Sequence, residues 1–481
     1  MIKENARSVA LDCLMLTVEE GQFSHAVLNG ARAKYAWMTP EDRSFFTRLV
    51  HGTLEYLIQA DRILNARSSV KVRKMKPAVR NILRMSVYQL LYLDRIPARA
   101  VINEAVNLTA ARGLHGLKGF VNAVLRRVSS EREEILKEIA ESRDLSYRYS
   151  CPEWIAALLE KQYGRARTEL ALEAFLQPQP LWFRRNRTME RRNENEAARP
   201  AASAGSSAAI QAAVSSGNGE SIQAAASAGN GEENSCPWCP DVIGLRDGGK
   251  LREPELLNSG AGWIQDLSSA IALRAAAPAP GMTVIDLCAA PGGKSMAAAD
   301  LMGDSGIVRA FDLTEGKVEL IRENAVRNGF SCIRAEQNDA RIFREDLEGT
   351  ADLVIADLPC SGLGVMGRKP DIRLNASPEG IASLAELQKE ILRNAVRFVR
   401  PGGRLLFSTC TMTFAENDEN RAWLLQNYPE LSPVDLTGTL PELSEVPGAE
   451  TLKEGWFQIL PGVLPCDGFF FSLYRKAGGT G

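Results

Sequence analysis

Two cysteines at the ends of neighbouring predicted strands are the residues best suited to chemistry. Cys360 follows the apolar run "ADLVIADLP" (351–359), and Cys410 follows "RLLFST" (404–409). A single buried cysteine usually serves only as a small apolar side chain. The carboxyl ends of parallel strands, however, meet at one edge of a sheet, so thiols at two adjacent ends face one crevice. We therefore treat both cysteines as candidate nucleophiles, and their positions alone do not say which one attacks.

A second candidate site is the run "VIDLCAAPGGKS" (284–295), in which a strand-like stretch leads into a turn of small residues. A phosphate-binding P-loop would need a glycine at 288, where the chain has Cys288. The dinucleotide fingerprint fails as well, because the two glycines, Gly292 and Gly293, are adjacent. Small residues let the backbone approach a ligand closely. The remaining interpretation is a Rossmann-like turn that holds S-adenosylmethionine.

Acidic residues at the strand ends favour this interpretation. Asp312 closes "IVRAFD", 19 residues after Gly293, close to the spacing expected of an acid that binds ribose hydroxyls. Asp339 in "QNDA" follows the next strand, where it could meet the adenine amine. Asp286 and Asp357 end the first and fourth strands. Four acids at one sheet edge favour a cofactor site over a structural turn with scattered solvated acids.

Two thiols suit one demanding reaction, the methylation of cytosine at carbon 5. Carbon 5 is too weakly nucleophilic to take a methyl group directly. A thiolate that adds at carbon 6 raises the electron density on carbon 5, so covalent catalysis replaces one difficult step by easier ones. The surroundings must activate a thiol with an ordinary pKa of roughly 8.5, and a second group must remove the proton from carbon 5. Asp357 would hydrogen-bond the cytosine edge at N3, and the base must leave its stack.

The elements that position these residues belong to two patterns. From about residue 240, strand patterns alternate with helices, which predicts an α/β domain with a mostly parallel sheet. The end, "DGFFFSLYRK" (467–476), reads as a late strand, antiparallel at the far side of the sheet. Residues 1–140 instead show helical periodicity, for example over 41–64, 77–94 and 97–113, and predict an all-α bundle.

Four segments follow from these patterns. We expect an all-α domain at 1–140, linker helices leading into the catalytic region at 141–187, a low-complexity insertion at 188–240 and a catalytic domain at 241–481. The insertion contains a near-exact duplication, "AIQAAVSSGNGE" and "SIQAAASAGNGE", with no large apolar face. We predict that it is disordered and assign it no chemistry.

Composition limits the class of protein and its compartment. The net charge is −2, yet residues 1–150 hold 24 Lys and Arg against 16 Asp and Glu, so the first third is basic. A basic segment indicates a polyanion as partner. Nine cysteines without dense spacing favour free thiols in a reducing compartment. No leader-like or membrane-length apolar run is present, so we expect a cytoplasmic protein that does not bind membranes.

Four blocks occur together and in one order: "DLCAAPGGKS", "DLPCSGLGVMGRKPDIR", "FSTCTMTFAENDEN" and "DGFFFSLYRK". With them the chain resembles the Sun/NOP2 family of RNA cytosine-5 methyltransferases. The helical first third, in which "NILRMSVYQLLYLDRIPARAVINEAVNLT" resembles the NusB RNA-binding domain, narrows the resemblance to bacterial 16S ribosomal RNA enzymes of the RsmB/Sun/Fmu type. The resemblance covers nearly the whole chain except about 188–240.

The resemblance implies a class I methyltransferase domain with a mostly parallel seven-stranded sheet, preceded by a NusB-like all-α domain, and S-adenosylmethionine as cofactor. It assigns Cys410 as the nucleophile, Cys360 to product release and Asp357 to cytosine contact. The implied cofactor-binding residues are Cys288, Ala289, Ala290, Pro291, Gly292, Gly293, Lys294, Asp312, Asp339 and Asp357. The expected partner is 16S ribosomal RNA and the expected state a monomer. The alternative is a non-catalytic antitermination-type factor that keeps the cofactor fold as a scaffold, although such a factor should have lost one cysteine.

Basic residues are candidates for contact with RNA phosphates. Residues 62–84 contain eight basic residues and no acid, and "GRKPDIR" (367–373) and "FRRNR" (183–187) are further candidates. A solvated charged face is the plainer interpretation. The predicted RNA-contacting residues are Arg62, Arg67, Lys71, Arg73, Lys74, Lys76, Arg80, Arg368, Lys369 and Arg373, with Arg84 in the same run.

Two further motifs are less specific. "CPWC" (236–239) has metal-ligand spacing, but no second pair of ligands accompanies it, so we predict free thiols and no metal. "IQDLSSA" (264–270) either lines the methionine end of the cofactor pocket or is a helix start capped by Asp266.

Overall fold

The computed structural model describes residues 5–197, 236–245 and 257–478. The chain forms two compact units. The helical unit comprises Met1–Gln177 and Val365–Ser377, and the sheet unit comprises Pro178–Gly364 and Pro378–Gly481. The division at 177 does not coincide with the boundaries placed at 140 and 187, because the helices after 140 pack with the helical unit.

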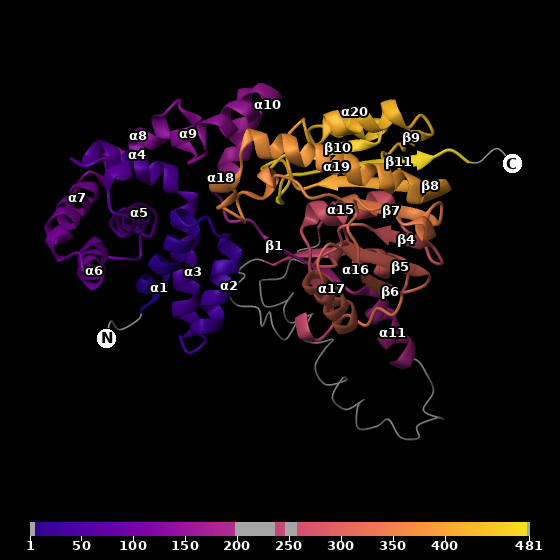
Figure 1. The fold of residues 1–481 in the computed structure, drawn as a ribbon, viewed down its shortest axis with the longest axis horizontal. Helices are drawn as coiled ribbons and strands as arrows, with labels where there is room; N and C mark the ends of the chain where they lie inside the picture. The colour runs from indigo at the N-terminus through magenta and orange to yellow at the C-terminus, as the bar shows by residue number, and fades with distance from the viewer. Residues whose placement is uncertain (1–4, 198–235, 246–256, 479–481) are drawn as a thin grey trace, which may run out of the picture. The chain divides into compact units, whose positions relative to one another are not determined.

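The helical unit is a bundle around α5 (Pro77–Tyr92), which packs against α1, α3, α4, α6 and α7 (Figure 1). Most α5 side chains between Val79 and Leu91 are buried, as its dense apolar sequence predicts. The other helices of this unit are α1 (Ala6–Leu14), α2 (Ser24–Lys34), α3 (Pro40–Glu55), α4 (Leu57–Arg67), α6 (Ala98–Ala111), α7 (Lys118–Ser130), α8 (Arg132–Glu141), α9 (Leu145–Arg148), α10 (Glu153–Ala174) and α18 (Ile372–Asn375).

The helix predicted over 41–64 is two helices that meet at Tyr56. The Tyr56 ring stacks on Tyr92 with centroids 3.9 Å apart and also on Tyr88. Gly52 lies so close to Tyr88 that a Cβ there would be 2.0 Å from the ring. This packing is long-range, so the helical periodicity of 41–64 carries no sign of the break.

The sheet unit is built on an eight-stranded mixed sheet. Its main path is β10-β11-β8-β7-β4-β5-β6, in which β4 to β8 are parallel, β11 is antiparallel to β8, and β9 pairs only with β11. The predicted fold class is thereby confirmed, with β10 rather than the predicted late strand at the edge. The strands are β4 (Thr283–Asp286), β5 (Ile307–Asp312), β6 (Ile333–Gln337), β7 (Ala351–Asp357), β8 (Val399–Thr409), β9 (Leu431–Pro433), β10 (Trp456–Ile459) and β11 (Phe469–Lys476).

Helices cover both faces of this sheet (Figure 1). Along β7, Leu353 and Ile355 belong to the core under α15, α16 and α17, whereas Val354 and Ala356 belong to the core under α19 and α20. This alternation is the two-residue period of a strand buried on both faces. The helices are α15 (Leu267–Ala276), α16 (Gly293–Leu301), α17 (Glu315–Arg327), α19 (Pro378–Phe398) and α20 (Asp418–Asn427).

A small antiparallel sheet with the order β2-β1-β3 precedes the main one. It consists of β1 (Leu181–Arg185), β2 (Val242–Leu245) and β3 (Gly262–Ile264), and α11 (Arg187–Ala197) follows β1. Thr188 at the start of α11 donates to the Asp300 carboxylate. The predicted disordered insertion at 188–240 is therefore wrong at its flanks, because α11 and the turn at 236–240 are ordered; residues 198–235 lie outside the described residues.

One short segment leaves the sheet unit and belongs to the helical unit. Within Val365–Ser377, the buried Asp371 carboxylate accepts hydrogen bonds from the Ser24 backbone N–H at 3.1 Å and from its hydroxyl at 2.5 Å. A carboxylate at the first residue of α2 satisfies a helix N-terminal donor and complements the helix dipole. The connection between β7 and α19 begins near Cys360. Its segment Val365–Ser377 is therefore held by residues of the helical unit before the chain returns to the sheet unit at Pro378.

Candidate active site

The turn between β4 and α16 has the close backbone approach that its small residues predict. Gly292 has a φ of +102°, which favours glycine, and α16 begins at Gly293. Ser295, in the first turn of α16, donates a 2.7 Å hydrogen bond to Asp286 at the end of β4. Strand, turn and helix are therefore tied together as one rigid loop.

Two buried acceptors beside this turn have no donor among the described residues. They are Asp286 Oδ1 and Gln265 Oε1, and the Gln265 side chain donates to the Gly293 carbonyl at 3.3 Å. Burial raises the pKa of Asp286 from 3.8 to about 7. Unpaired buried acceptors at a backbone turn fit a ligand that carries an ammonium group, as S-adenosylmethionine does. Asp266 also caps α15, so both interpretations of "IQDLSSA" have a structural counterpart.

Asp312 lies at the end of β5, as predicted, and contacts the same turn. Its carboxylate accepts from the Ala290 backbone N–H at 3.0 Å and pairs with Lys317 at 2.9 Å. Asp339 follows β6, where the Arg341 side chain hydrogen-bonds its carboxylate and lowers its pKa. Burial raises the pKa of the Cys288 thiol, with Asp286 and Asp312 adding to the effect. Asp286, Asp312 and Asp357 thus contact residues of this turn or of the start of α16, whereas Asp339 pairs with Arg341.

The two candidate cysteines converge. The sulfurs of Cys360 and Cys410 are 3.2 Å apart, although 50 residues separate them. Contact with Cys410 and burial raise the pKa of Cys360 well above its ordinary value. Either thiol can donate to the other in this contact, so its geometry alone does not say which sulfur attacks.

Asp357 joins the turn to the cysteine loops. Lys294 Nζ lies 2.6 Å from Asp357 Oδ2, and the Ser408 hydroxyl donates to Oδ1 at 2.7 Å. The Lys294 ammonium also lies 5.1 Å from the centre of the Phe469 ring. Lys294 and Asp357 belong to separate sequence motifs. The sequence predicted neither their ion pair nor the hydrogen bond from Ser408 to Asp357.

Glu416 is a further residue of this site, and no sequence motif singled it out. Its side chain is fully buried and accepts hydrogen bonds from Ser361 and Thr413, residues that accompany the two cysteines. The spacing of Thr413 and Glu416 is that of a helix capping box, and the Glu416 N–H does donate to the Thr413 hydroxyl at 3.3 Å. The Thr413–Glu416 spacing therefore predicts a helix start, and it does not indicate that Glu416 lies beside the two cysteine loops.

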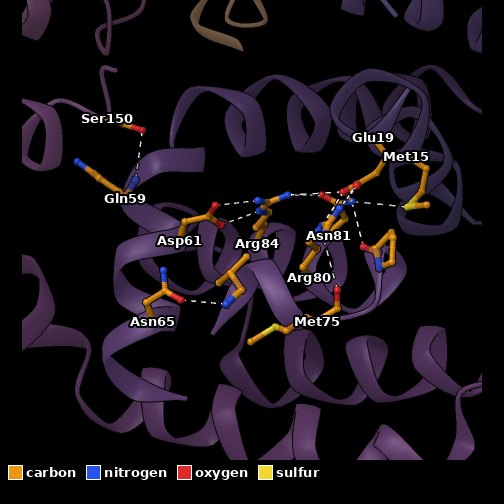
Figure 2. A network of polar contacts seen from close by, with 12 residues as sticks. Met15, Glu19, Gln59, Asp61, Asn65, Met75, Arg80, Asn81, Arg84 and Ser150 are labelled. Atoms are coloured by element: carbon orange, nitrogen blue, oxygen red, sulfur yellow. Dashed lines mark hydrogen bonds and ion pairs between the residues drawn. The ribbon is translucent and has the colours of Figure 1, made fainter. Parts of the chain in front are cut away.

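Several of the predicted RNA-contacting arginines are used inside the helical unit. Figure 2 shows Arg80 paired with Glu19, and Arg84 bound through two nitrogens to Asp61 at 2.7 Å. Arg67, whose side chain is 6% exposed, pairs with Glu131 and Glu138. The prediction of phosphate contact is wrong for the buried Arg67 and Arg84.

Other basic residues remain available at the surface. Arg62 pairs with Asp144 but is partly exposed. In the second candidate segment Lys369 is exposed and Arg368 half-buried. Arg373 is buried, its pKa lowered by burial, so its predicted phosphate contact is also wrong. Exposed residues of the first basic run are Lys71, Arg73, Lys74 and Lys76.

The other predicted basic segment, 183–187, also serves the structure. Arg184 is fully buried in β1 near Asp241 and Asp300, and Arg185 pairs with Glu190. Phosphate contact at Arg184 is therefore excluded.

All nine cysteines are free, including buried Cys236 and Cys239. In the ranges that the structure describes, no three His, Cys, Asp or Glu side chains gather as a metal would require. None of the helices in those ranges is both long and apolar enough to span a membrane.

Comparison with solved structures supports the fold. The crystal structure of PH0851 matches with a TM-score of 0.73 and 23% identity over 99% of this chain and 100% of that one. A methyltransferase homologue from Pyrococcus horikoshii matches with a TM-score of 0.52 and 25% identity over 69% of this chain and 98% of that one. Fold and site together define a Rossmann-like methyltransferase domain joined to a helical bundle.

Sequence comparison identifies the family. A model described as 16S rRNA methyltransferase RsmB/F matches residues 273–475, and the NusB family model matches residues 4–130. The probable ribosomal RNA small subunit methyltransferase B of Bacillus subtilis (strain 168) is 34% identical, over 99% of this chain and 100% of that protein. The corresponding protein of Synechocystis sp. is 30% identical over 98% and 100%. The chain belongs to the RsmB/F family of 16S rRNA methyltransferases.

Proposed function

We propose that this protein transfers the methyl group of S-adenosylmethionine to carbon 5 of a cytosine in 16S ribosomal RNA, through a covalent bond between Cys410 and carbon 6. The observation that supports this most directly is the 3.2 Å separation of the Cys360 and Cys410 sulfurs beside the Lys294–Asp357 pair. Family membership supports the methyltransferase activity and the RNA substrate.

The cofactor supplies an electrophilic methyl group when bound. Asp286 and Gln265 would accept hydrogen bonds from its amino-acid end, and the Gly292–Gly293 turn would allow close approach. Asp312 at the end of β5 would accept from the ribose hydroxyls, and Asp339 would face the adenine. Together these residues supply the hydrogen-bond acceptors that S-adenosylmethionine requires.

Cys410 begins the reaction as a thiolate, its thiol proton having passed to water. Its sulfur adds to carbon 6, and the carbon 5–carbon 6 π pair moves to carbon 5 and the N3 edge. The Asp357 carboxylate accepts a hydrogen bond from the N4 amino group at that edge. The Lys294 ammonium, 2.6 Å from Asp357, offsets the negative charge that the ring gains. The electron pair on carbon 5 then takes the methyl group. The substrate is left bonded to Cys410 with one proton still on carbon 5.

Cys360 completes the reaction as a base. The contact with Cys410 is the largest cause of the raised pKa of Cys360. Once the Cys410 sulfur is bonded to carbon 6, this contact no longer raises the pKa of Cys360 in the same way. Cys360 then loses its proton to water more readily and removes the proton from carbon 5. The electron pair of that C–H bond restores the ring double bond and expels Cys410 as a thiolate.

Cysteine variants test this proposal. Cys410→Ala should abolish methyl transfer to 16S rRNA and keep cofactor binding, whereas Cys360→Ala should accumulate a protein–RNA adduct on a denaturing gel. An adduct that forms with Cys410→Ala would show that the two roles are exchanged. Failure of the unaltered protein to methylate rRNA would support the non-catalytic alternative, which the convergence of two intact cysteines disfavours.

We also propose that the helical unit contacts the RNA backbone through its exposed basic residues. Lys71, Arg73, Lys74 and Lys76 lie in and beside one 3-10 turn (Val72–Lys74) and are exposed. Each phosphate contact makes binding more sensitive to salt. Replacing two of these residues by Ala should weaken RNA binding and reduce the slope of affinity against salt, and an unchanged slope would contradict the proposal.

A further inference from the structure

A buried carboxylate links the two loops that carry the cysteines. Glu416 is fully buried, and no Lys or Arg lies within ion-pair distance of it among the described residues. Its Oε1 accepts from the Ser361 N–H at 2.8 Å and from Gln388 at 3.2 Å. Its Oε2 accepts from the hydroxyls of Ser361 at 2.6 Å and Thr413 at 2.7 Å. These four donors keep the buried charge from being isolated.

The direction of these hydrogen bonds extends the link to the second loop. The Ser361 hydroxyl has one proton, which it gives to Glu416, so Thr411 must donate in the 2.7 Å contact between Ser361 and Thr411. Ser361 directly follows Cys360, and Thr411 directly follows Cys410. Gln388 adds a second restraint, because it also donates to the Pro359 carbonyl at 2.9 Å.

We propose that Glu416 is a positioning residue that holds the Cys360 and Cys410 loops in register for the two sulfur-dependent steps. This inference rests on the proposed function. Contact with Cys410 and burial raise the pKa of Cys360 most, and the negative charge of Glu416 adds to this rise. Because Glu416 is fully buried and acts through Ser361 and Gln388, it is a positioning residue and not a catalytic one.

Glu416→Gln separates positioning from general stability. The amide keeps the shape but removes the charge and half of the acceptor capacity. We expect kcat for rRNA methylation to fall at least about tenfold, with KM for the cofactor nearly unchanged. Alkylation of Cys360 in the free protein should move to lower pH, because the neighbouring negative charge is gone. A structural role alone would not produce a slower enzyme with a more easily ionised thiol.

Controls and a second variant keep the test decisive. Glu419→Gln, an exposed acid three residues further on, should behave as the unaltered protein. If Glu416→Gln does not fold, Ser361→Ala removes only the hydroxyl that joins Glu416 to Thr411 and should still lower kcat. Unchanged kcat and alkylation in either folded variant would overturn the proposal. Alkylation of Cys360 needs no RNA, so its result tests the role of Glu416 even if the methyltransferase proposal is wrong.

A different observation concerns a hollow of about 350 Å³ on the helical unit, lined by Arg32, Arg43, Ser44 and Thr47. These side chains offer hydrogen-bond donors and no carboxylate. Neither arginine has an ion-pair partner among the described residues, in contrast to Arg67, Arg80 and Arg84 of the same unit. Arg43 gives one N–H to the Ala36 carbonyl at 3.2 Å, which fixes the direction of its guanidinium.

We infer that this hollow binds a phosphate of the RNA backbone. Arginine presents a rigid fork of donors that matches phosphate geometry. The Ser44 hydroxyl can complete the contact, whereas Thr47 gives its hydroxyl proton to the Arg43 carbonyl at 2.8 Å. Trp37, between α2 and α3, is 67% exposed and offers a face on which an unpaired base could stack. The exposed Glu41 and Asp42 in the first turn of α3 disfavour a second phosphate on that side.

Salt-dependent RNA binding by the full chain tests this site. Arg32→Ala and Arg43→Ala should each weaken binding of a 16S rRNA transcript and reduce the slope of log affinity against log salt by about 1. Arg126→Ala, an exposed arginine on α7, should change the slope much less. Equal effects of all three substitutions would indicate a diffuse field and overturn the site. Cofactor affinity, which should stay constant, distinguishes this failure from failure of the methyltransferase proposal.

Discussion

Asp286 is the residue whose ionisation should control cofactor affinity. It is buried at the end of β4, and burial raises its pKa to about 7. An acid with a raised folded-state pKa favours folding while protonated, so the stability that it contributes in the free protein falls as pH rises from about 4 to about 7. A bound ammonium group would reverse this preference by stabilising the carboxylate.

We therefore predict that cofactor affinity increases as pH rises through about 7 and then levels off. Asp286→Asn should bind more weakly and lose this pH dependence. Calorimetric titration with S-adenosylmethionine at several pH values measures both effects. The same pH dependence in Asp286→Asn would mean that another group is responsible.

Asp312 has two roles at once, because it would accept from the ribose and also holds the Ala290 N–H at 3.0 Å. Asp312→Ala should weaken cofactor binding about tenfold or more, since it removes a charged acceptor from a buried site. Lys317→Ala should have little effect, because its ion pair with Asp312 is largely exposed on the lysine side. Unchanged cofactor affinity in Asp312→Ala would exclude the ribose contact.

For single residues, the sequence predicts at which strand ends the candidate site residues lie, but not which side chains contact one another. Cys360 and Cys410 could be found because strand ends of a parallel sheet share one edge. The ion pair between Lys294 and Asp357 could not, because it joins the end of β7 to the first turn of α16, 63 residues earlier. The ion pairs of Arg67 with Glu131 and Glu138 could not be predicted either, since a run of basic residues does not show which of them meet an acid from another helix.

At the scale of elements, the loop after β7 depends on a close approach of two backbones. Gly364 N–H donates to the Cys410 carbonyl at 3.1 Å, and the Gly468 N–H donates to the Gly364 carbonyl at 2.9 Å. A Cβ at Gly364 would lie 2.1 Å from the Gly468 carbonyl oxygen. Gly364 therefore holds the Cys360 loop against β8 and the start of β11.

Gly364→Ala should push these backbones apart and displace the Cys360 loop. We expect a loss of about 2 kcal/mol in the free energy of unfolding, in the range of overpacked sites, and a larger proportional loss of methylation. Urea denaturation and methyl incorporation measure the two effects. Gly438→Ala, where a Cβ would meet nothing within 4 Å, is the control. Equal stability of the two variants would contradict the close packing.

Element types were predictable because periodicity reflects local burial. The alternation along β7 and the apolar face of α5 are both visible in the sequence. The break at Tyr56 and the short strands β1 to β3 were less accessible, because tertiary packing determines them. The three-residue β3, for example, pairs with β1 some 80 residues earlier, a contact that no local pattern encodes.

At the scale of the whole molecule, the chain does not assign one continuous stretch to each unit. Residues 365–377 lie within the catalytic motifs of the sequence yet belong to the helical unit. The run "GRKPDIR" reads as a basic surface loop, but Asp371 and Arg373 are both buried. Composition cannot show this, because Ser24, which donates to Asp371, and Glu55, which lies near Arg373, are more than 300 positions earlier in the chain.

Arg373 should be the main anchor of this segment. Its guanidinium is buried, donates to the Met366 carbonyl at 3.2 Å, and lies near Glu55 and Cys151. Burial raises the pKa of Glu55 to about 7, and the positive charge of Arg373 opposes this rise. Without Arg373, ionised Glu55 would be buried with less compensation, so the stability lost as pH rises through 7 should increase.

Arg373→Met keeps the apolar stem and removes the charge, and we expect it to lower the free energy of unfolding by about 3 kcal/mol near neutral pH, as when a buried charge loses its partner. The loss should be smaller in acid, where Glu55 is protonated. Lys369→Met, on the exposed part of the same segment, should leave stability nearly unchanged. Thermal denaturation across pH compares the two variants. If they unfold alike at every pH, the segment is not anchored through Arg373, and the buried Asp371 must hold it alone.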